Sequence, residues 1–143
     1  MVNYWLCVTD RVNWQVIRDK LVWGVSDRYK SVIEQVRVGD VLVFYVKPKR
    51  ICGIFEVASK PYTSTERIFK SGGISGHETF PHRVKLKPVL VPKECLNFEL
   101  LIPKLKFIKN KERWTGHLRR AMVSISEQDF ELIKKELGAI VST

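Results

Sequence analysis

Cysteine is scarce in this chain, and no hydrophobic run approaches the length of a membrane span. The three cysteines, Cys7, Cys52 and Cys95, are widely spaced and odd in number. Cys7 and Cys52 stand in apolar runs typical of strands, so we expect reduced thiols buried as small hydrophobic side chains. The first residues carry no basic segment and no small-residue cleavage site, so no signal peptide is predicted. These absences indicate a cytoplasmic protein that does not bind a membrane.

The local motifs of common enzyme and metal sites are also missing. The glycine-rich stretch at residues 72–76 lacks the Gly-Lys-Ser/Thr ending of a nucleotide-binding P-loop. The possible soft metal ligands do not have zinc-site spacing; they are His77, His82, Cys95 and His117. No Ser-His-Asp, Cys-His or paired-carboxylate pattern stands out, although His82 could meet Asp10 or Glu78 in space. We therefore predict no cofactor, no metal and no catalytic residue.

The composition is that of an ordinary globular protein. Hydrophobic residues make up 45% of the 143 positions and charged residues 28%, which is typical of a single globular domain. A chain of this length buries a sizeable core without disulfides or metals. We therefore expect one domain over residues 1–143.

The formal net charge is +10, and it is distributed unevenly along the chain. Residues 47–120 hold seventeen basic and six acidic side chains, whereas residues 1–46 hold six and five, and residues 121–143 hold two and four. A segregated basic region attracts polyanions, because each neutralised phosphate releases counterions. The alternative is the solvated surface of a heat-adapted protein, which the low Asn and Gln content also suggests. The segregation favours a nucleic-acid partner.

Hydrophobic periodicity predicts several strands with short helices between them. We expect strands over residues 3–8, 41–46, 52–58, 83–91 and 121–125. We expect short helices over residues 14–21, 29–36 and 97–106, and a terminal helix beginning at the capping box Ser126-Glu127-Gln128-Asp129. Residues 60–82 and 107–120 are expected to be loops. The predicted fold is α+β, with a curved sheet of five to six strands closing on itself as a small barrel.

Trp23 stands where the first predicted helix runs out, and Gly24 follows it at once. This places a large flat ring at a chain turn. A ring held at a rigid turn can stack on a nucleic-acid base. The alternative is a core tryptophan, and position alone does not decide between the two.

Four short motifs occur in an order and spacing that resemble a known family. They are Tyr4-Trp5-Leu6, Trp23-Gly24-Val25, the run from Val38-Gly39-Asp40 to Phe44-Tyr45, and Gly53-Ile54-Phe55-Glu56-Val57. The chain resembles, from Tyr4 to about Leu137, the EVE domain, which belongs to the PUA-like superfamily and is related to the YTH domains. The resemblance implies a pseudo-barrel that reads modified bases in DNA or RNA.

The resemblance also implies a base-binding site. Trp23 matches the first cage tryptophan of YTH domains, and Thr9 and Asp10 match the turn that contacts the base edge, with Asn13 close by. No tryptophan matches the second cage position, where Phe80 is the nearest aromatic residue. We expect Tyr45 and Phe80 to close the cage. The resemblance therefore predicts a base pocket without naming the base.

Basic side chains in two segments are candidates for phosphate binding. The first segment is the predicted hairpin turn, and the second is the loop before the last strand; the candidates are Lys47, Lys49, Arg50, Lys109, Lys111, Arg113 and Arg119. Trp114 in that loop could equally clamp a nucleic-acid strand or cap the barrel.

The leading hypothesis is a nucleic-acid-binding module, monomeric by expectation, that takes a flipped, methylated base into its pocket. One alternative is an enzyme that modifies or hydrolyses RNA or nucleosides, with His82 as its candidate acid or base. Another is a structural protein whose basic face docks an acidic protein. Binding to modified and unmodified oligonucleotides discriminates among them.

Overall fold

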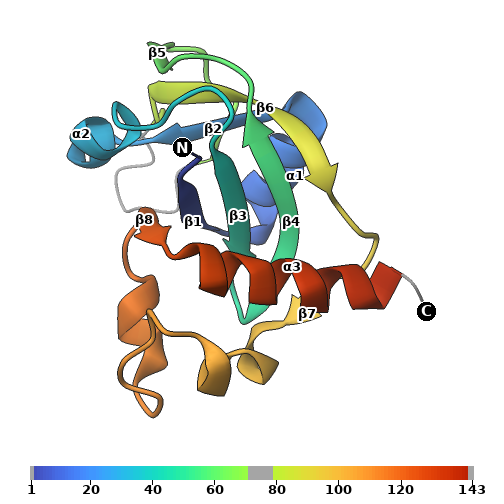
Figure 1. Ribbon diagram of the computed structural model, residues 1–143. Helices are drawn as coiled ribbons and strands as arrows, with labels where there is room; N and C mark the ends of the chain where they lie inside the picture. Colours follow the sequence, from blue (N-terminus) through green and yellow to red (C-terminus); the bar gives the residue numbers. More distant parts are fainter. Residues whose placement is uncertain (1, 71–78, 142–143) are drawn as a thin grey trace.

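The computed structural model describes residues 2–70 and 79–141 of the chain. Its centre is a curved sheet with the strand order β2-β6-β4-β3-β1-β8, while the short strands β5 and β7 pair with β6 and β4 (Figure 1). The strands are β1 (Tyr4–Thr9), β2 (Val22–Val25), β3 (Val41–Val46), β4 (Arg50–Val57), β5 (Tyr62–Thr63), β6 (His82–Leu90), β7 (Leu96–Asn97) and β8 (Met122–Ile125). The prediction of an α+β fold with a curved sheet is confirmed.

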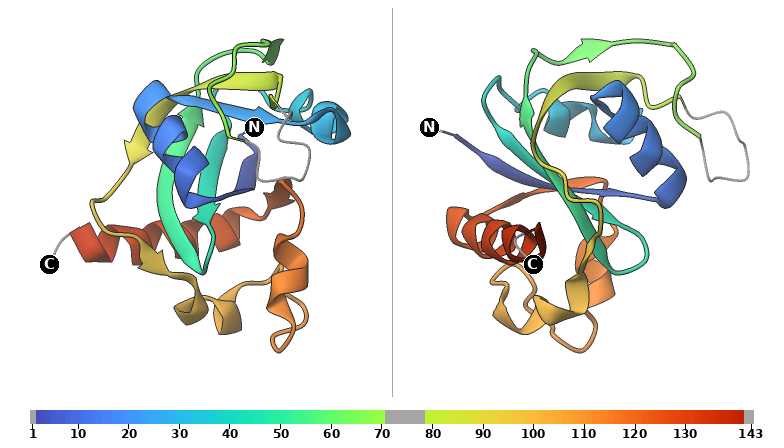
Figure 2. Two further views of the ribbon diagram at one scale, coloured as in Figure 1. Left: turned by 180° about the vertical axis from the view of Figure 1, so that it is seen from behind. Right: turned by 90° about the vertical axis from the view of Figure 1, so that its right-hand side faces the viewer.

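Helices cover both faces of this sheet. The α-helices are α1 (Arg11–Lys20), α2 (Lys30–Ile33) and α3 (Glu127–Val141), and the 3-10 helices are η1 (Asp27–Tyr29), η2 (Phe98–Leu100), η3 (Ile102–Lys104) and η4 (Trp114–Leu118). The helices α1 and α3 lie on opposite sides of the sheet (Figure 2). None of the helices in the described parts of the chain is long and apolar enough to cross a membrane.

Three predicted helices differ in outcome. The terminal helix is confirmed, and the hydroxyl of Ser126 accepts the backbone N–H of Asp129 at 3.1 Å, as the capping box predicted. The helix predicted over residues 29–36 is shorter and consists of η1 and α2. The helix predicted over residues 97–106 is wrong: β7, η2 and η3 occupy this stretch. Pro103 has no N–H to donate, so a continuous helix cannot pass through it. It lies in the first turn of the short helix η3, where no such donor is needed.

The strand β3 is buried on both faces. Leu42, Phe44 and Val46 belong to the core beside α1 and β2, whereas Val43 and Tyr45 belong to the core beneath α3 and the 3-10 helices. This division follows from the alternation of side chains along a strand. Neighbouring residues of β3 therefore pack into cores on opposite sides of the sheet.

The strands β1 and β3 run parallel, so their carboxyl ends lie at the same edge of the sheet. Thr9 at the end of β1 pairs with Val46, and its carbonyl accepts the N–H of Lys47 at 2.9 Å. Asp10 follows β1, and Lys47 follows β3. The polar residues after these two strands are thus held side by side.

The prediction that Trp23 stands at a turn is wrong, because α1 ends before it. Leu21 adopts a left-handed conformation with φ 56°, and its N–H donates to the carbonyl of Ile17, which closes the helix. The strand β2 then begins at Val22, and Trp23 pairs with Val84 of β6. Trp23 is therefore a strand residue with a fixed orientation.

The prediction of a reduced Cys52 is also wrong. Cys52 of β4 is bonded to Cys95, with 4.4 Å between their Cα atoms. The two cysteines meet because Ile51 pairs with Leu96 in the short β4–β7 ladder, a contact between distant segments that spacing does not reveal. Cys7 is a free thiol, fully buried as predicted, and its burial raises its pKa well above the usual value.

Candidate functional site

A small cavity lies where the carboxyl ends of β1 and β3 approach β2. Its volume is about 180 Å³. It is lined by Val8, Thr9, Asp10, Asn13, Trp23, Gly24, Ser26, Tyr29, Lys47, Phe69, Phe80 and Ala121. We call this space the Trp23 cavity. The fold thus brings together the carboxyl ends of two parallel strands, the start of α1 and one face of β2.

Aromatic rings form part of the wall of the Trp23 cavity. Trp23 is only 4% exposed, and its ring meets that of Phe44 edge-on, with 5.3 Å between centroids. Phe69 and Phe80 contact each other edge-to-face at 5.9 Å, and Tyr29 adds a further ring. A flat ligand in this cavity would meet apolar aromatic surface.

Polar groups at the start of α1 form another part of the wall. Asp10 is the N-cap of the helix, and its Oδ1 accepts the N–H of Asn13 at 2.8 Å. The amide of Asn13 is bonded to the backbone of Lys70: its Oδ1 accepts the N–H and its Nδ2 donates to the carbonyl, both at 2.7 Å. Asn13 therefore fixes the segment that carries Phe69, while the polar residues Thr9 and Asp10 also line the cavity.

One buried polar atom at this wall has no partner. Nε1 of Trp23 is the single buried side-chain nitrogen or oxygen without a hydrogen bond in the described parts of the chain. The indole N–H can only donate, and burying it unpaired costs about 1–3 kcal/mol. Such groups are uncommon in native proteins and often mark functional sites.

Arg83 of β6 holds the segment that bears Phe69 and Phe80. Its side chain is 1% exposed; Nε donates to the carbonyl of Phe80 at 3.0 Å, and Nη2 donates to the carbonyls of Thr79 at 2.9 Å and Glu66 at 2.5 Å. The guanidinium also lies 5.3 Å from the ring centre of Phe69. Burial lowers the pKa of Arg83 from its ordinary value. The aromatic wall therefore depends on a buried cation outside the cavity lining.

Gly24 is required where this segment crosses β2. A Cβ atom at position 24 would lie 2.7 Å from a ring atom of Phe69 and 2.8 Å from the carbonyl oxygen of Phe80. Backbone cannot give way as a flexible side chain does, so the close approach of the two segments needs glycine.

A second cavity, of about 370 Å³, lies against the β3–β4 hairpin turn and η4. It is lined by Tyr45, Lys47, Pro48, Lys49, Trp114, Thr115, Leu118 and Arg119. We call it the Trp114 cavity. Lys47 lines both cavities, so the two spaces are neighbours at the hairpin turn.

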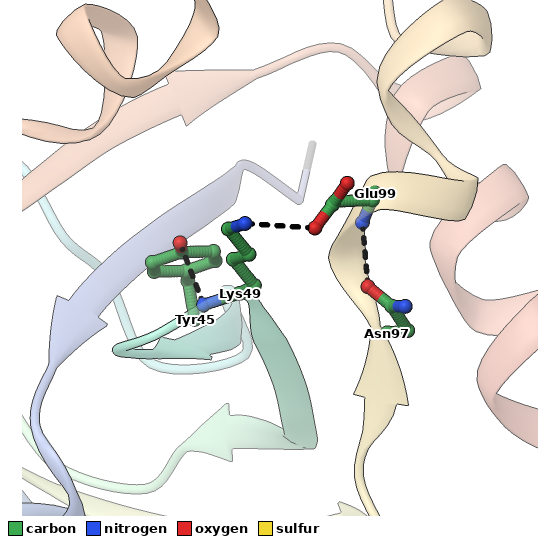
Figure 3. A network of polar contacts seen from close by, with 4 residues as sticks. All are labelled: Tyr45, Lys49, Asn97 and Glu99. Atoms are coloured by element: carbon green, nitrogen blue, oxygen red, sulfur yellow. Dashed lines mark hydrogen bonds and ion pairs between the residues drawn. The ribbon is translucent and has the colours of Figure 1, made fainter.

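The hairpin turn is fastened to η2 by a short polar network (Figure 3). The hydroxyl of Tyr45 accepts the N–H of Lys49 at 2.9 Å, and Nζ of Lys49 lies 2.9 Å from Oε1 of Glu99. Oδ1 of Asn97 accepts the N–H of Glu99 at 3.0 Å. Burial raises the pKa of the Tyr45 hydroxyl above its ordinary value. The network fixes one wall of the Trp114 cavity.

Residues 3–136 match the family model for the EVE domain. The chain belongs to the EVE domain family. A UPF0310 protein of Pyrococcus abyssi is 46% identical over 146 residues, which cover 95% of this chain and 100% of the relative.

Solved YTH domains share the fold of this EVE domain. The Pho92 YTH domain in complex with m6A superposes with a TM-score of 0.67 at 13% identity, covering 95% of this chain and 86% of that one. A YTH domain-containing protein mmi1 in an RNA complex gives 0.66 at 11% identity, covering 99% and 87%. The resemblance to the EVE family, and its relation to YTH domains, is confirmed.

Most residues predicted to bind a base line the same cavity of the EVE domain. Trp23, Thr9, Asp10, Asn13 and Phe80 all border the Trp23 cavity. Tyr45 does not, because it follows Phe44 on β3 and therefore faces the other side of the sheet, where it lines the Trp114 cavity.

The residues predicted to bind phosphate are spread more widely. Lys47, Lys49 and Arg119 border the Trp114 cavity, and Lys49 is already paired with Glu99. Lys109 borders a separate hollow beside His117. Arg50, Lys111 and Arg113 are exposed and line neither named cavity, and Nζ of Lys111 donates to the carbonyl of Leu105.

The residue proposed for an enzymatic alternative does not reach either cavity of the EVE domain. His82 is 8% exposed, and its Nε2 lies 2.6 Å from Oδ1 of the exposed Asp27. It pairs with Val25 across the β2–β6 ladder and is absent from both linings. Residues 72–76, His77 and Glu78 lie outside the described residues. Among the described residues, no group of three or more His, Cys, Asp or Glu could hold a metal ion.

The sequence did not reveal Phe69, Tyr29, Ser26 or Arg83 as parts of this site. Arg83 is the first residue of the strand predicted over 83–91, in which basic and apolar residues alternate, so in the sequence it resembles the exposed Lys85 on the same strand face. Phe69 and Ser26 lie in irregular segments where periodicity does not predict orientation, and Tyr29 ends the short helix η1. Only the three-dimensional structure identifies these four residues as neighbours of the cavity.

Proposed function

We propose that this protein is a nucleic-acid-binding module that accepts one flipped, modified base in the Trp23 cavity. The observation that carries the proposal is the composition of this cavity: aromatic residues, the polar residues Thr9 and Asp10, and the cation Lys47 border one small space. Stacking on aromatic rings and hydrogen bonds to the base edge are the usual means of holding an unpaired base.

The relatives support this proposal through their fold. The similar YTH structures contain m6A in one case and RNA in another. The net charge of +10, concentrated between residues 47 and 120, suits a partner with phosphate groups. Whether that partner is RNA or DNA is part of the test.

The aromatic part and the polar part of the cavity wall would together discriminate a modified base from an unmodified one. An added methyl group fills apolar space beside Trp23 and Phe80 and strengthens stacking. The carboxylate of Asp10 can only accept hydrogen bonds, so it favours a base edge that offers N–H groups. Lys47 at the end of β3 would contact the phosphate next to the flipped base.

The test is a binding comparison with single strands of about nine nucleotides. The probes are an RNA with a central N6-methyladenosine, a DNA with a central 5-methylcytosine, and both unmodified strands. Fluorescence anisotropy at low salt should show at least about tenfold tighter binding to one modified probe, which corresponds to about 1.4 kcal/mol. Equal binding of every modified and unmodified pair would reject the base pocket.

Two substitutions locate the preference without removing core residues. Ala121→Leu adds volume to the cavity lining and should abolish the preference while binding through phosphates persists. Asp10→Asn keeps a residue that caps helices equally well, but it replaces one acceptor by an amide and should change the preferred probe. Asp19→Asn, an exposed acidic residue of the same helix, is the matched control and should leave the preference unchanged.

A further inference from the structure

The Trp114 cavity has no role in holding the flipped base, yet it borders the same hairpin turn. Lys47 lines both cavities, so one cation borders the Trp23 cavity and the Trp114 cavity. The space is larger than the Trp23 cavity, about 370 Å³ against about 180 Å³.

Trp114 offers a partly free ring to this space. One side of the ring packs against Phe98, with 5.6 Å between centroids and 48° between planes, and the residue is only half-buried. The contact holds the indole at the wall of the Trp114 cavity. A partly exposed tryptophan with a supported ring can act as a stacking platform for an unpaired base.

The polar groups of the Trp114 cavity are donors and cations. Tyr45 is 4% exposed, and its hydroxyl accepts the N–H of Lys49 but has no acceptor for its own proton among the described residues. Arg119 and Lys47 make no ion pair with any described residue, whereas Lys49 is paired with Glu99. A ligand that fits must bring hydrogen-bond acceptors and negative charge.

We propose that the Trp114 cavity binds the nucleotide adjacent to the flipped base in a single strand. Its base stacks on Trp114, and its phosphate lies between Lys47 and Arg119 within reach of the Tyr45 hydroxyl. This inference rests on the proposed base pocket, because Lys47 connects the two sites. The module then reads two successive nucleotides, one by its modification and one by stacking.

The experiment uses the full chain and two classes of probe. The modified RNA and DNA strands described above are long enough to span both cavities, whereas the free nucleosides N6-methyladenosine and 5-methyl-2′-deoxycytidine can occupy only one. Trp114→Leu keeps apolar contact with Phe98 but removes the flat platform. We expect it to weaken binding of the preferred strand about tenfold and to leave nucleoside binding within about twofold of the wild-type value.

Further variants separate stacking, charge and folding. Trp114→Phe restores a ring and should recover most of the strand affinity. Arg119→Gln should lower the slope of log affinity against log salt by about 0.7, the share of one phosphate on a single strand, whereas the exposed control Lys135→Gln should not.

The outcomes distinguish this inference from the function on which it rests. If Trp114→Leu and Arg119→Gln bind the modified strands as tightly as the wild-type protein does, the second site alone is overturned. Loss of nucleoside and strand binding together in Trp114→Leu shows that Trp114 acts through the fold, which also overturns it. Absence of wild-type binding to any strand or nucleoside overturns both proposals. Tighter binding of a polyglutamate peptide than of any strand, lost in Trp114→Leu, would assign the cavity to an acidic protein segment instead.

Discussion

Trp23 illustrates how one side chain can serve the core and a cavity at once. It is 4% exposed and packs on Phe44, so its removal opens the core as well as the site. Its Nε1 is nevertheless unpaired, so the buried indole N–H lowers the stability of the fold. A variant at this position must therefore be judged by folding before binding.

Two substitutions of Trp23 should differ sharply in stability. Trp23→Ala should lower the free energy of unfolding by about 3–5 kcal/mol, the usual cost of deleting a buried aromatic ring. Trp23→Phe keeps a ring and removes an unpaired donor, so its loss should stay below about 2 kcal/mol. Urea unfolding followed by circular dichroism measures both. Equal losses would mean that the indole N–H does have a partner in solution.

Arg83 is the second residue whose role is visible only in the fold. We expect Arg83→Met to cost about 3 kcal/mol of unfolding free energy, because carbonyl groups of Glu66, Thr79 and Phe80 lose their donor. Lys85→Met, on the same face of β6 but exposed, should change stability by less than about 0.5 kcal/mol. A calorimetric comparison of the two variants decides; similar melting temperatures would contradict the anchoring role.

At the scale of elements, the sequence predicts five of the eight strands in the described residues and misses β2 and the two-residue strands β5 and β7. Residues 41–46 and 52–58 were recognised because continuous apolar runs bounded by a basic turn are typical of a central hairpin, and β3 and β4 confirm them. The strand β2 was missed because its four residues follow α1 after a single left-handed residue, with no turn signal between. The sequence therefore predicts a turn at Trp23, directly after a helix that ends at residue 21, instead of a strand.

The candidate site could be predicted only in part, because local sequence patterns do not reveal strand orientation or contacts between distant segments. Thr9, Asp10 and Trp23 were found through the family resemblance, and the cavity gathers them. Tyr45 was assigned to the wrong side, because a strand buried on both faces gives no alternation of polar and apolar residues from which to read orientation. Phe69 could not be found, because Arg83 and Asn13 fix its segment through backbone contacts that leave no pattern in the sequence.

The disulfide between Cys52 and Cys95 ties β4 to the segment leading into the 3-10 helices. It closes a loop of 43 residues. The chain-entropy estimate for such a loop is about 4 kcal/mol, so Cys95→Ser should lower the unfolding free energy by up to that amount. Denaturant curves with and without a reductant provide the measurement. The reductant should destabilise the wild-type protein but not Cys95→Ser; an equal response of both would argue against the bond.

At the scale of the whole molecule, we expect the uneven charge to set the affinity for nucleic acid and the Trp23 cavity to set the selectivity among bases. Cations between residues 47 and 120 attract any polyanion, whereas in the proposed function the Trp23 cavity distinguishes between bases. Raising the salt concentration should therefore weaken binding of modified and unmodified strands alike and leave their ratio nearly constant.

A single cation should account for a defined share of this salt dependence. Lys47→Gln should lower the slope of log affinity against log salt by about 0.7, because one phosphate contact on a single strand is lost. Lys134→Gln removes an exposed charge of α3 that lines neither cavity and should leave the slope unchanged. Anisotropy titrations at four salt concentrations or so would resolve the difference; identical slopes for both variants would place the strand elsewhere.

The parallel pairing of β1 and β3 has a consequence for how such a protein can acquire a new preference. Asp10 and Lys47 follow these strands, so they lie outside the ladder of hydrogen bonds that aligns Thr9 with Val46. Segments at strand ends can be exchanged without disturbing strand pairing. A library that varies the turn at Asp10 and the hairpin at residues 47–49 would thus alter recognition on an unchanged frame.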